Sequence, residues 1–260
     1  MKHYTKMAST TGDSAFQSQA SDLRIYCAFS FPAVAQALGP DRWSEIAPLF
    51  QTLTHDVQRK VRRTLAYSLH EIAKILGPDL AEKELESTFQ LYLKDLEEVR
   101  AGVIAHIASF LGALSPACRE SFLPILLDII TDNAAIHWRF RCMLASQVAT
   151  LSNLFSSAAT YSVVVPLTIS LLTDDVADVR MEVCKSIGAL VKRLGEADPA
   201  WRTSVVERLL QLGASKNYQH RLTLVRFCDH LSREVCSVGD PRTGGYGFSP
   251  MPVWALRWSP

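Results

Sequence analysis

The chain has 260 residues, 48% of them hydrophobic, and a formal net charge of +1 at pH 7. Such a balanced charge argues against a basic nucleic-acid-binding surface along the whole chain. No stretch reaches the roughly 18 uninterrupted apolar residues of a membrane-spanning helix, and residues 1–21 lack the apolar run of a signal peptide. We therefore expect an intracellular protein that contacts neither nucleic acid nor membrane, cytoplasmic and with a nuclear location left open.

Residues 1–20 are rich in Ser, Thr and Gln and contain few large apolar side chains. Such a segment cannot offset the entropy lost on ordering, so we predict a disordered N-terminal tail. The first predicted helix, residues 21–38, carries Leu23, Cys27, Phe31 and Val34 on one helical face. Because the tail offers it no partner helix, we expect an unpaired N-terminal helix.

The same apolar stripe returns in residues 56–77. This segment is the second helix of a two-helix unit, whose first helix is predicted at residues 43–53. Val61, Leu65 and Leu69 lie on one helical face, and Gly77 followed by Pro78 ends the helix, because Gly adopts positive φ and Pro cannot continue a helix. Further first helices are predicted at residues 81–94, 116–130, 159–173 and 199–212, each followed by another copy of the stripe. An arginine follows the first stripe position in six copies, at spacings of 38, 38, 41, 39 and 41 residues: Arg24, Arg62, Arg100, Arg141, Arg180 and Arg221.

A period near 40 residues, with an acid and then Val-Arg at the start of the second helix, is typical of HEAT repeats. The predicted fold is therefore an all-α, HEAT-type α-solenoid over residues 21–235, with about five helical hairpins and the unpaired N-terminal helix. Residues 236–260 contain four prolines and four glycines with scattered aromatic residues. We predict an irregular C-terminal tail there.

The recurring acids and arginines are interpreted as a structural ladder, because they can hydrogen-bond between neighbouring turns. Its predicted members are Asp56, Arg62, Asp95, Arg100, Arg141, Asp175, Arg180 and Arg221. The third unit departs from the pattern, with Asp132-Asn133 displaced by a longer turn, and the fifth carries Asn217 where an acid is expected.

Other residues exceed the repeat pattern and are candidates for partner binding. Arg59, Lys60, Arg63 and Arg139 are surplus charges in the turns of the first and third complete units, and Trp138 precedes Arg139. An aromatic and an arginine together can anchor a partner, although packing of Trp138 inside a long turn explains it equally well.

No catalytic, cofactor or metal site is expected. The seven histidines occupy different positions within the repeat, and no acid or cysteine recurs beside them, so no set of metal ligands is formed by the pattern. The six cysteines form no Cys-x-x-Cys pair, and Cys27, Cys184 and Cys228, at or near the apolar stripes, are expected to be reduced, small apolar residues. The sequence also lacks a Gly-x-Ser-x-Gly elbow and a Gly-rich phosphate loop.

Four segments together resemble the serine/threonine-protein phosphatase 4 regulatory subunit 1 family. They are Leu23-Arg-Ile-Tyr-Cys with Phe31-Pro-Ala-Val-Ala, Lys60-Val-Arg-Arg-Thr-Leu-Ala with His70-Glu, Leu93-Lys-Asp-Leu-Glu-Glu-Val-Arg100, and Trp138-Arg-Phe-Arg141. The resemblance extends over residues 23–234. It implies a non-catalytic HEAT-repeat protein that associates with the phosphatase 4 catalytic subunit, in an architecture shared with the related phosphatase 2A scaffold.

The chain departs from that family in being short, in beginning within a repeat and in its sequence after Val235. We therefore expect a truncated or alternatively terminated member that contacts other proteins through the solenoid surface and regulates or scaffolds a phosphatase 4 type catalytic subunit. The alternative is a general HEAT-repeat adaptor without a phosphatase partner, for instance in transport or chromatin assembly. Purification of the chain with its bound partners distinguishes the two.

Overall fold

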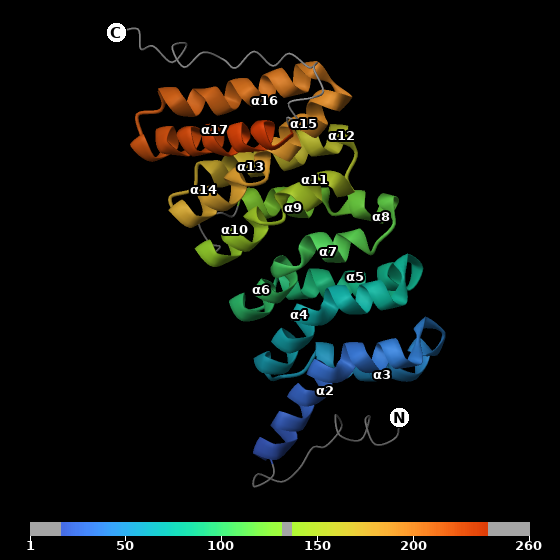
Figure 1. Ribbon diagram of the computed structural model, residues 1–260. Helices are drawn as coiled ribbons and strands as arrows, with labels where there is room; N and C mark the ends of the chain where they lie inside the picture. The colour runs from blue at the N-terminus through green and yellow to red at the C-terminus, as the bar shows by residue number, and fades with distance from the viewer. Residues whose placement is uncertain (1–16, 132–136, 239–260) are drawn as a thin grey trace.

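The computed structural model describes residues 17–131 and 137–238, and every regular element in these two ranges is a helix (Figure 1). In chain order these are α2 (Gln17–Leu38), η1 (Pro40–Arg42), α3 (Trp43–Thr54), α4 (Arg59–Leu76), α5 (Pro78–Leu93), α6 (Glu97–Ala105), α7 (Ile107–Gly112), α8 (Pro116–Ser121), α9 (Leu123–Thr131), α10 (Trp138–Ala145), α11 (Val148–Leu154), α12 (Ser157–Ala159), the π-helical turn η2 (Thr160–Val164), α13 (Val165–Leu172), α14 (Ala177–Cys184), α15 (Ile187–Ala197), α16 (Pro199–Gln211), η3 (Leu212–Ala214) and α17 (Tyr218–Val238). None of these helices is long and apolar enough to cross a membrane.

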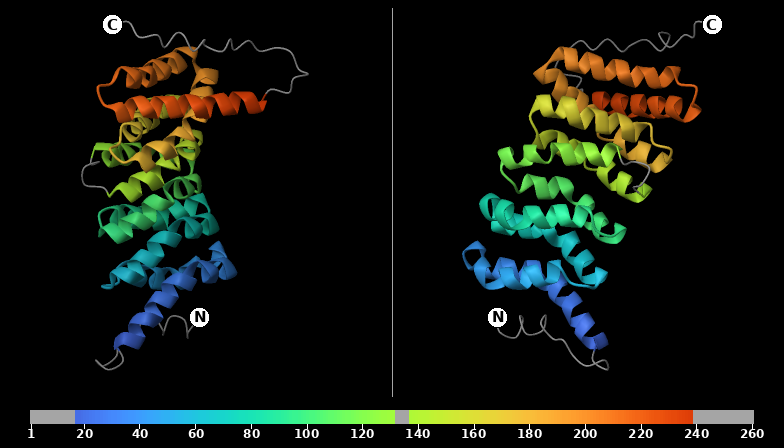
Figure 2. Two further views of the ribbon diagram at one scale, coloured as in Figure 1. Left: turned by 60° about the vertical axis from the view of Figure 1, so that its left-hand side comes forward. Right: turned by 180° about the vertical axis from the view of Figure 1, so that it is seen from behind.

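The described helices form five stacked hairpins with α2 as an additional helix at the beginning (Figures 1 and 2). The second helices pack on one another in chain order: α2 on α4, α4 on α6, α6 on α10, α10 on α14 and α14 on α17. The two ends of the stack lie far apart, with α2 at one end and α16 and α17 at the other (Figure 2). This arrangement confirms the predicted all-α solenoid.

The predicted apolar stripes form the core that joins the hairpins. Val61, Leu65, Leu69 and Ile72 of α4 are all buried, as are their counterparts in α6, α7, α10, α11, α14 and α15. Aromatic rings fill the space between the two helices of a unit. Phe89 of α5 stacks on Phe110 of α7 with ring centroids 4.4 Å apart.

Glycine and proline divide neighbouring units, as the sequence predicts. Gly77 has φ +75°, a conformation that a residue with a Cβ rarely adopts, and its N–H donates to the carbonyl of Ala73. Pro78 then opens α5 at the position where a helix needs no N–H. Gly39 and Pro40 repeat this turn, with the same φ of +75°.

Three second helices are broken where the sequence predicts one continuous helix. The breaks fall at His106, at Ser146 and Gln147, and at Lys185 and Ser186. These are equivalent repeat positions, five or six residues after Arg100, Arg141 and Arg180. By contrast α4 and α17 run unbroken.

The ends of the solenoid also differ slightly from the prediction. α2 begins at Gln17 rather than at residue 21, and α17 continues to Val238 rather than ending at residue 235. The rest of the two predicted tails, residues 1–16 and 239–260, lies outside the described residues.

Candidate protein-interaction surface

Ladder arginines join one repeat to the next. The Arg62 guanidinium donates from Nε and Nη2 to the carboxylate of Asp95, at 2.7 and 2.9 Å, and from Nη1 to the carbonyl of Asp56 at 2.7 Å. Arg141 makes the same two-point contact with Asp174, at 2.5 and 3.0 Å. Each arginine therefore spans from its own helix to the acid in the next turn, a geometry suited to a planar guanidinium.

The ladder acids also hold the turns in which they lie. The carboxylate of Asp56 accepts from the N–H of Gln58 at 2.8 Å and pairs with Arg24 at 3.1 Å. Asp95 accepts from the N–H of Leu96 at 2.6 Å. The hydrogen bonds from Arg62, together with this N–H, hold the pKa of Asp95 below its ordinary value. The acid thus fixes the start of its helix and its contact with the preceding repeat.

The prediction of Asp175 as a ladder acid is wrong. Asp174 occupies that place: it is buried, it pairs with Arg141, and its carboxylate accepts from the N–H of Val176 at 2.8 Å. It stands six residues before Arg180, as Asp56 stands before Arg62. Asp175 is exposed, and its carbonyl accepts from Arg180 at 2.9 Å.

The two later ladder arginines donate to backbone carbonyls rather than to a carboxylate of the next turn among the described residues. Arg180 donates to the two carbonyls of its own turn, and Arg221 does the same with the carbonyls of Ser215 and Lys216, at 2.7 and 3.0 Å. In this last turn Ser215, rather than Asn217, stands at the position of Asp56 and Asp174. A hydroxyl there cannot form the charged pair that an acid forms.

Arg100 lacks a described partner for one of its polar atoms. Its Nε atom is buried and has no hydrogen-bond partner among the described residues. The segment in which its acid is expected, Asp132-Asn133, lies outside those residues.

Sequence reasoning missed three further side chains that link repeats. Arg119 donates to the carbonyls of Leu114, at 3.0 and 2.9 Å, and of Leu154, at 3.1 Å. Arg193 donates to the carbonyl of Phe155 at 2.7 Å. These carbonyls lie at the ends of second helices, where no intrahelical donor is left for them. The two arginines occupy different repeat positions, so no recurring signal marked them.

Gln147 is the third missed link, and it bridges the helix break in the preceding repeat. Its Oε1 accepts from the N–H of Ala108 at 3.0 Å, and its Nε2 donates to the carbonyl of Ile104 at 2.9 Å. One side-chain amide therefore partners a backbone donor and a backbone acceptor on opposite sides of His106.

The candidate partner-binding residues do not form one cluster. Arg59, Lys60 and Arg63 begin α4, whereas Trp138 and Arg139 begin α10, and α6 is stacked between these two helices (Figure 1). Lys60 and Arg139 are exposed. The other basic residues on α4 face nearby groups: Arg59 lies 3.6 Å from Glu98, and Arg63 lies 5.9 Å from the ring centroid of Tyr67.

Trp138 packs within its own turn. The ring is half-buried and stacks on His137, and the Arg139 guanidinium lies 4.9 Å from its centroid. A cation over a tryptophan face is attracted by the ring. The pair is thus preorganised at the start of α10.

Charges alternate in sign at the repeat position of Lys60 and Arg139, two residues before the ladder arginine. Along the stack this position holds Asp22, Lys60, Glu98, Arg139, Asp178 and Gln219. All the charged members are exposed. Alternation places opposite charges in neighbouring repeats, so this edge carries discrete charges rather than one basic field.

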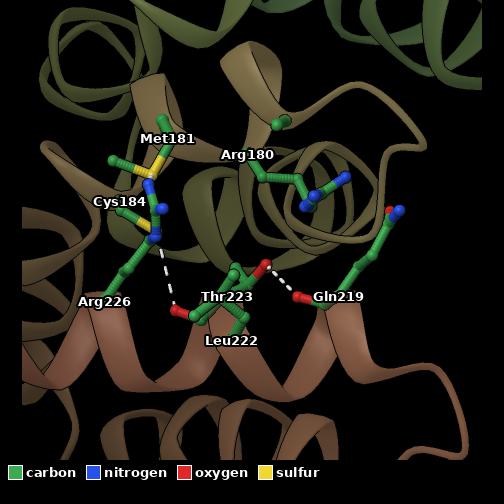
Figure 3. A pocket seen from close by; sticks show the side chains of 8 residues that line it. Arg180, Met181, Cys184, Gln219, Leu222, Thr223 and Arg226 are labelled. Carbon is green, nitrogen blue, oxygen red and sulfur yellow. Dashed lines mark hydrogen bonds between the residues drawn. The ribbon is translucent and has the colours of Figure 1, made fainter.

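The hollow between α14 and α17 is too small for a substrate (Figure 3). It measures about 40 Å³, enough for a few waters, since one water needs roughly 10 to 15 Å³ of such space. Burial raises the pKa of the Cys184 thiol to about 11, so this side chain is not a ready nucleophile. A second, open hollow of about 550 Å³ lies between α2 and α4 and includes Pro32, Gln36, Glu71 and Lys74.

Two histidines form the one stacked imidazole pair of the described chain. The rings of His70 and His106 lie 4.0 Å apart between α4 and the break that separates α6 from α7, and His70 Nε2 lies 2.8 Å from Glu71. Burial holds the pKa of both imidazoles below the ordinary value of 6.5. Within residues 17–131 and 137–238, no three or more His, Cys, Asp or Glu side chains gather as metal ligands would.

Family comparisons agree with this architecture. Residues 27–129 match the family model of the protein phosphatase 4 regulatory subunit 1 middle domain, and residues 164–194 match the HEAT repeat. The chain is 36% identical over 231 residues to serine/threonine-protein phosphatase 4 regulatory subunit 1 of Homo sapiens, covering 88% of this chain and 24% of that protein.

Two further human relatives are more distant. Serine/threonine-protein phosphatase 4 regulatory subunit 4 is 26% identical over 226 residues, covering 80% of this chain and 25% of that protein. The beta isoform of the 65 kDa regulatory subunit of serine/threonine-protein phosphatase 2A is 29% identical over 124 residues, covering 45% of this chain and 20% of that protein. The chain spans about a quarter of the length of the first relatives it matches.

Proposed function

Because this chain belongs to the protein phosphatase 4 regulatory subunit 1 family, we propose that it binds a serine/threonine phosphatase catalytic subunit of the phosphatase 4 type and has no catalytic activity of its own. The observation that carries the proposal is similarity to a named phosphatase regulatory subunit over 88% of this chain.

The stacked geometry supports a scaffold. Side-chain links such as Arg62 to Asp95 and Arg141 to Asp174 fix each turn relative to the next. The charged groups at the starts of the second helices are thereby held at fixed intervals along one edge. A partner that meets this edge contacts several repeats at once without ordering flexible loops, which lowers the entropic cost of binding.

We place the catalytic-subunit contact at the exposed charges that begin α4 and α10. Lys60 and Arg139 are the exposed cations at the repeat position two residues before the ladder arginine. The ring of Trp138 packs against the guanidinium of Arg139. Exposed charges of this kind mainly raise association rates. Arg59 is less suitable for a test by charge reversal, because glutamate there would face Glu98.

Affinity purification of the tagged chain with mass spectrometry tests the proposal. We expect a serine/threonine phosphatase catalytic subunit to be retained. The double variant Lys60→Glu/Arg139→Glu should retain it less well, mainly through slower association at low salt, while its melting temperature stays nearly unchanged.

The matched control is Arg208→Glu, an exposed charge reversal on α16, the first helix of the last hairpin. It should leave capture unchanged. Retention of other proteins without any phosphatase catalytic subunit would favour a general HEAT-repeat adaptor. Phosphatase activity in a preparation free of catalytic subunit would contradict the absence of catalysis.

A further inference from the structure

Two exposed aliphatic side chains lie in neighbouring turns at the starts of the second helices. Val57 is 90% exposed and Leu96 is 53% exposed, and each directly follows a ladder acid. The Arg62 guanidinium holds the two turns together, because it donates to the carbonyl of Val57 at 3.3 Å and to the carboxylate of Asp95 at 2.7 Å. The edge of the stack therefore presents two neighbouring aliphatic side chains in a fixed arrangement.

The charges around these two side chains change sign from one repeat to the next. The start of α4 carries two cations and the start of α6 carries two anions. On either side of this pair of helices, the equivalent position holds an anion on α2 and a cation on α10. All of these side chains are exposed: Asp22 on α2, Arg59 and Lys60 on α4, Glu97 and Glu98 on α6, and Arg139 on α10. The signs along four stacked second helices therefore read minus, plus, minus, plus.

This order of charges is complementary to itself when it is reversed. A two-fold axis between α4 and α6 sets the edge of a second copy antiparallel to the first. It places α4 opposite α6 of the second copy and α2 opposite α10, so each charge meets one of opposite sign. The spacing matches as well, because packed helices lie roughly 8 to 10 Å apart in both copies. Two-fold dimers are the commonest symmetric assembly of soluble proteins.

We propose that this edge binds a second copy of the same chain about that axis. Lys60 then faces Glu98 of the second copy, and Asp22 faces Arg139 of the second copy. The exposed aliphatic side chains of both copies meet at the axis, which gives the contact an apolar centre and a charged rim. Each copy buries only two aliphatic side chains there, so we expect a weak dimer that salt weakens further.

Attraction within one chain explains only part of this pattern. Arg59 lies 3.6 Å from Glu98 of the next repeat, so alternating signs also favour the stacking of repeats. These two side chains nevertheless stay 60% and 44% exposed, which leaves both accessible to a second copy. Stacking gives no reason for Val57 and Leu96 to point into water, whereas a dimer contact buries them.

The dimer also regulates the site of the proposed function. The second copy covers Lys60 and Arg139, the cations at which we place the catalytic-subunit contact. A chain within the dimer is therefore unavailable to the catalytic subunit, a consequence that rests on the proposed function. The dimer itself does not rest on that function, because the purified chain forms it alone.

Charge exchange between two variants tests the dimer. Sedimentation velocity at low salt, over a range of concentrations, measures self-association of the purified full chain. Lys60→Glu should weaken it about tenfold or more, because glutamate then faces Glu98 of the second copy, and Glu98→Lys should do the same. An equimolar mixture of the two variants restores opposite charges at both symmetry-related contacts. We expect that mixture to associate as strongly as the unchanged chain.

The aliphatic side chains and a distant charge provide the matched variants. Val57→Ser/Leu96→Ser should weaken self-association, whereas Arg208→Glu, an exposed reversal on α16, should leave it unchanged. Circular dichroism confirms that each variant is folded, including Glu98→Lys, whose new charge lies beside Arg59 at an exposed site where such pairs contribute little.

Two results overturn the proposal. One is a chain that stays monomeric at every concentration, and the other is a mixture of Lys60→Glu and Glu98→Lys that associates no better than either variant alone. A monomeric chain that still captures a phosphatase catalytic subunit leaves the proposed function standing. A dimeric chain that captures none contradicts that function and leaves the dimer standing.

Discussion

At the scale of single residues, an arginine that joins two repeats should contribute more to the free energy of unfolding than an exposed arginine. Arg62→Ala removes two hydrogen bonds to Asp95 and one to the carbonyl of Asp56, at a site where both charged side chains are less than one-fifth exposed. We expect a loss of about 1 to 3 kcal/mol in the free energy of unfolding. Urea denaturation measures it.

Arg59→Ala is the control for that substitution. Its guanidinium lies 3.6 Å from Glu98, but the two side chains are 60% and 44% exposed. Exposed pairs contribute little, so the change in unfolding free energy should stay below about 0.5 kcal/mol. Equal effects at positions 59 and 62 would contradict the ladder.

Spacing predicted the arginines of this ladder more reliably than its acids. Arg62 and Arg141 are found from the period alone, because each follows a buried stripe residue. Two adjacent acids, Asp174 and Asp175, satisfy the same pattern, and only the turn conformation decides which side chain points inward. Arg193 was out of reach because no other repeat carries an arginine at the equivalent position.

The stacked histidines predict a dependence of stability on pH. Protonation places a charge on His70 beside the ring of His106, where burial already disfavours it, with Lys74 adding repulsion and Glu71 attraction. Since both folded-state pKa values lie below the ordinary 6.5, the unfolded chain takes up protons first. The unfolding free energy should therefore be highest above this value and fall as pH decreases below it.

Urea midpoints between about pH 7 and pH 5 measure this dependence. His106→Gln removes one imidazole and should flatten it, while the protein remains folded because Gln147 stands at the same repeat position in the next unit. A slope unaffected by His106→Gln would show that the pair is not its source.

At the scale of helices, the break at His106 is built into a contact between repeats. Gln147→Ala leaves the N–H of Ala108 and the carbonyl of Ile104 without their side-chain partner. We expect a loss of about 1 to 3 kcal/mol and faster hydrogen exchange at Ala108. Gln90→Ala, which removes an exposed contact with Glu86, should change neither.

The sequence offers no sign of these breaks. Val103, Ile107 and Phe110 keep helical spacing across His106, and the core side of the helix is buried on both sides of it. Periodicity therefore predicts one helix. What interrupts it is visible only from the neighbouring repeat, where the Gln147 amide replaces backbone hydrogen bonds.

At the scale of the whole molecule, each hairpin of the stack packs mainly on its immediate neighbours. We call the side-chain contact between two neighbouring hairpins a joint. Arg62 and Asp95 form one joint, and Arg141 and Asp174 form another, between later hairpins. Substitutions at separate joints share no partner, so the losses from Arg62→Ala and Arg141→Ala should add to within about 0.5 kcal/mol.

Substitutions within one joint should behave differently. Once Arg62 is alanine, the carboxylate of Asp95 has already lost its two guanidinium hydrogen bonds, so Asp95→Ala in that background should cost much less than it does alone. A double-mutant cycle on urea midpoints measures the coupling, with Arg62→Ala/Arg141→Ala as the uncoupled reference. Strong coupling between the two separate joints would mean that strain passes along the stack as through a single globular core, and the repeats would then not be independent supports for a partner.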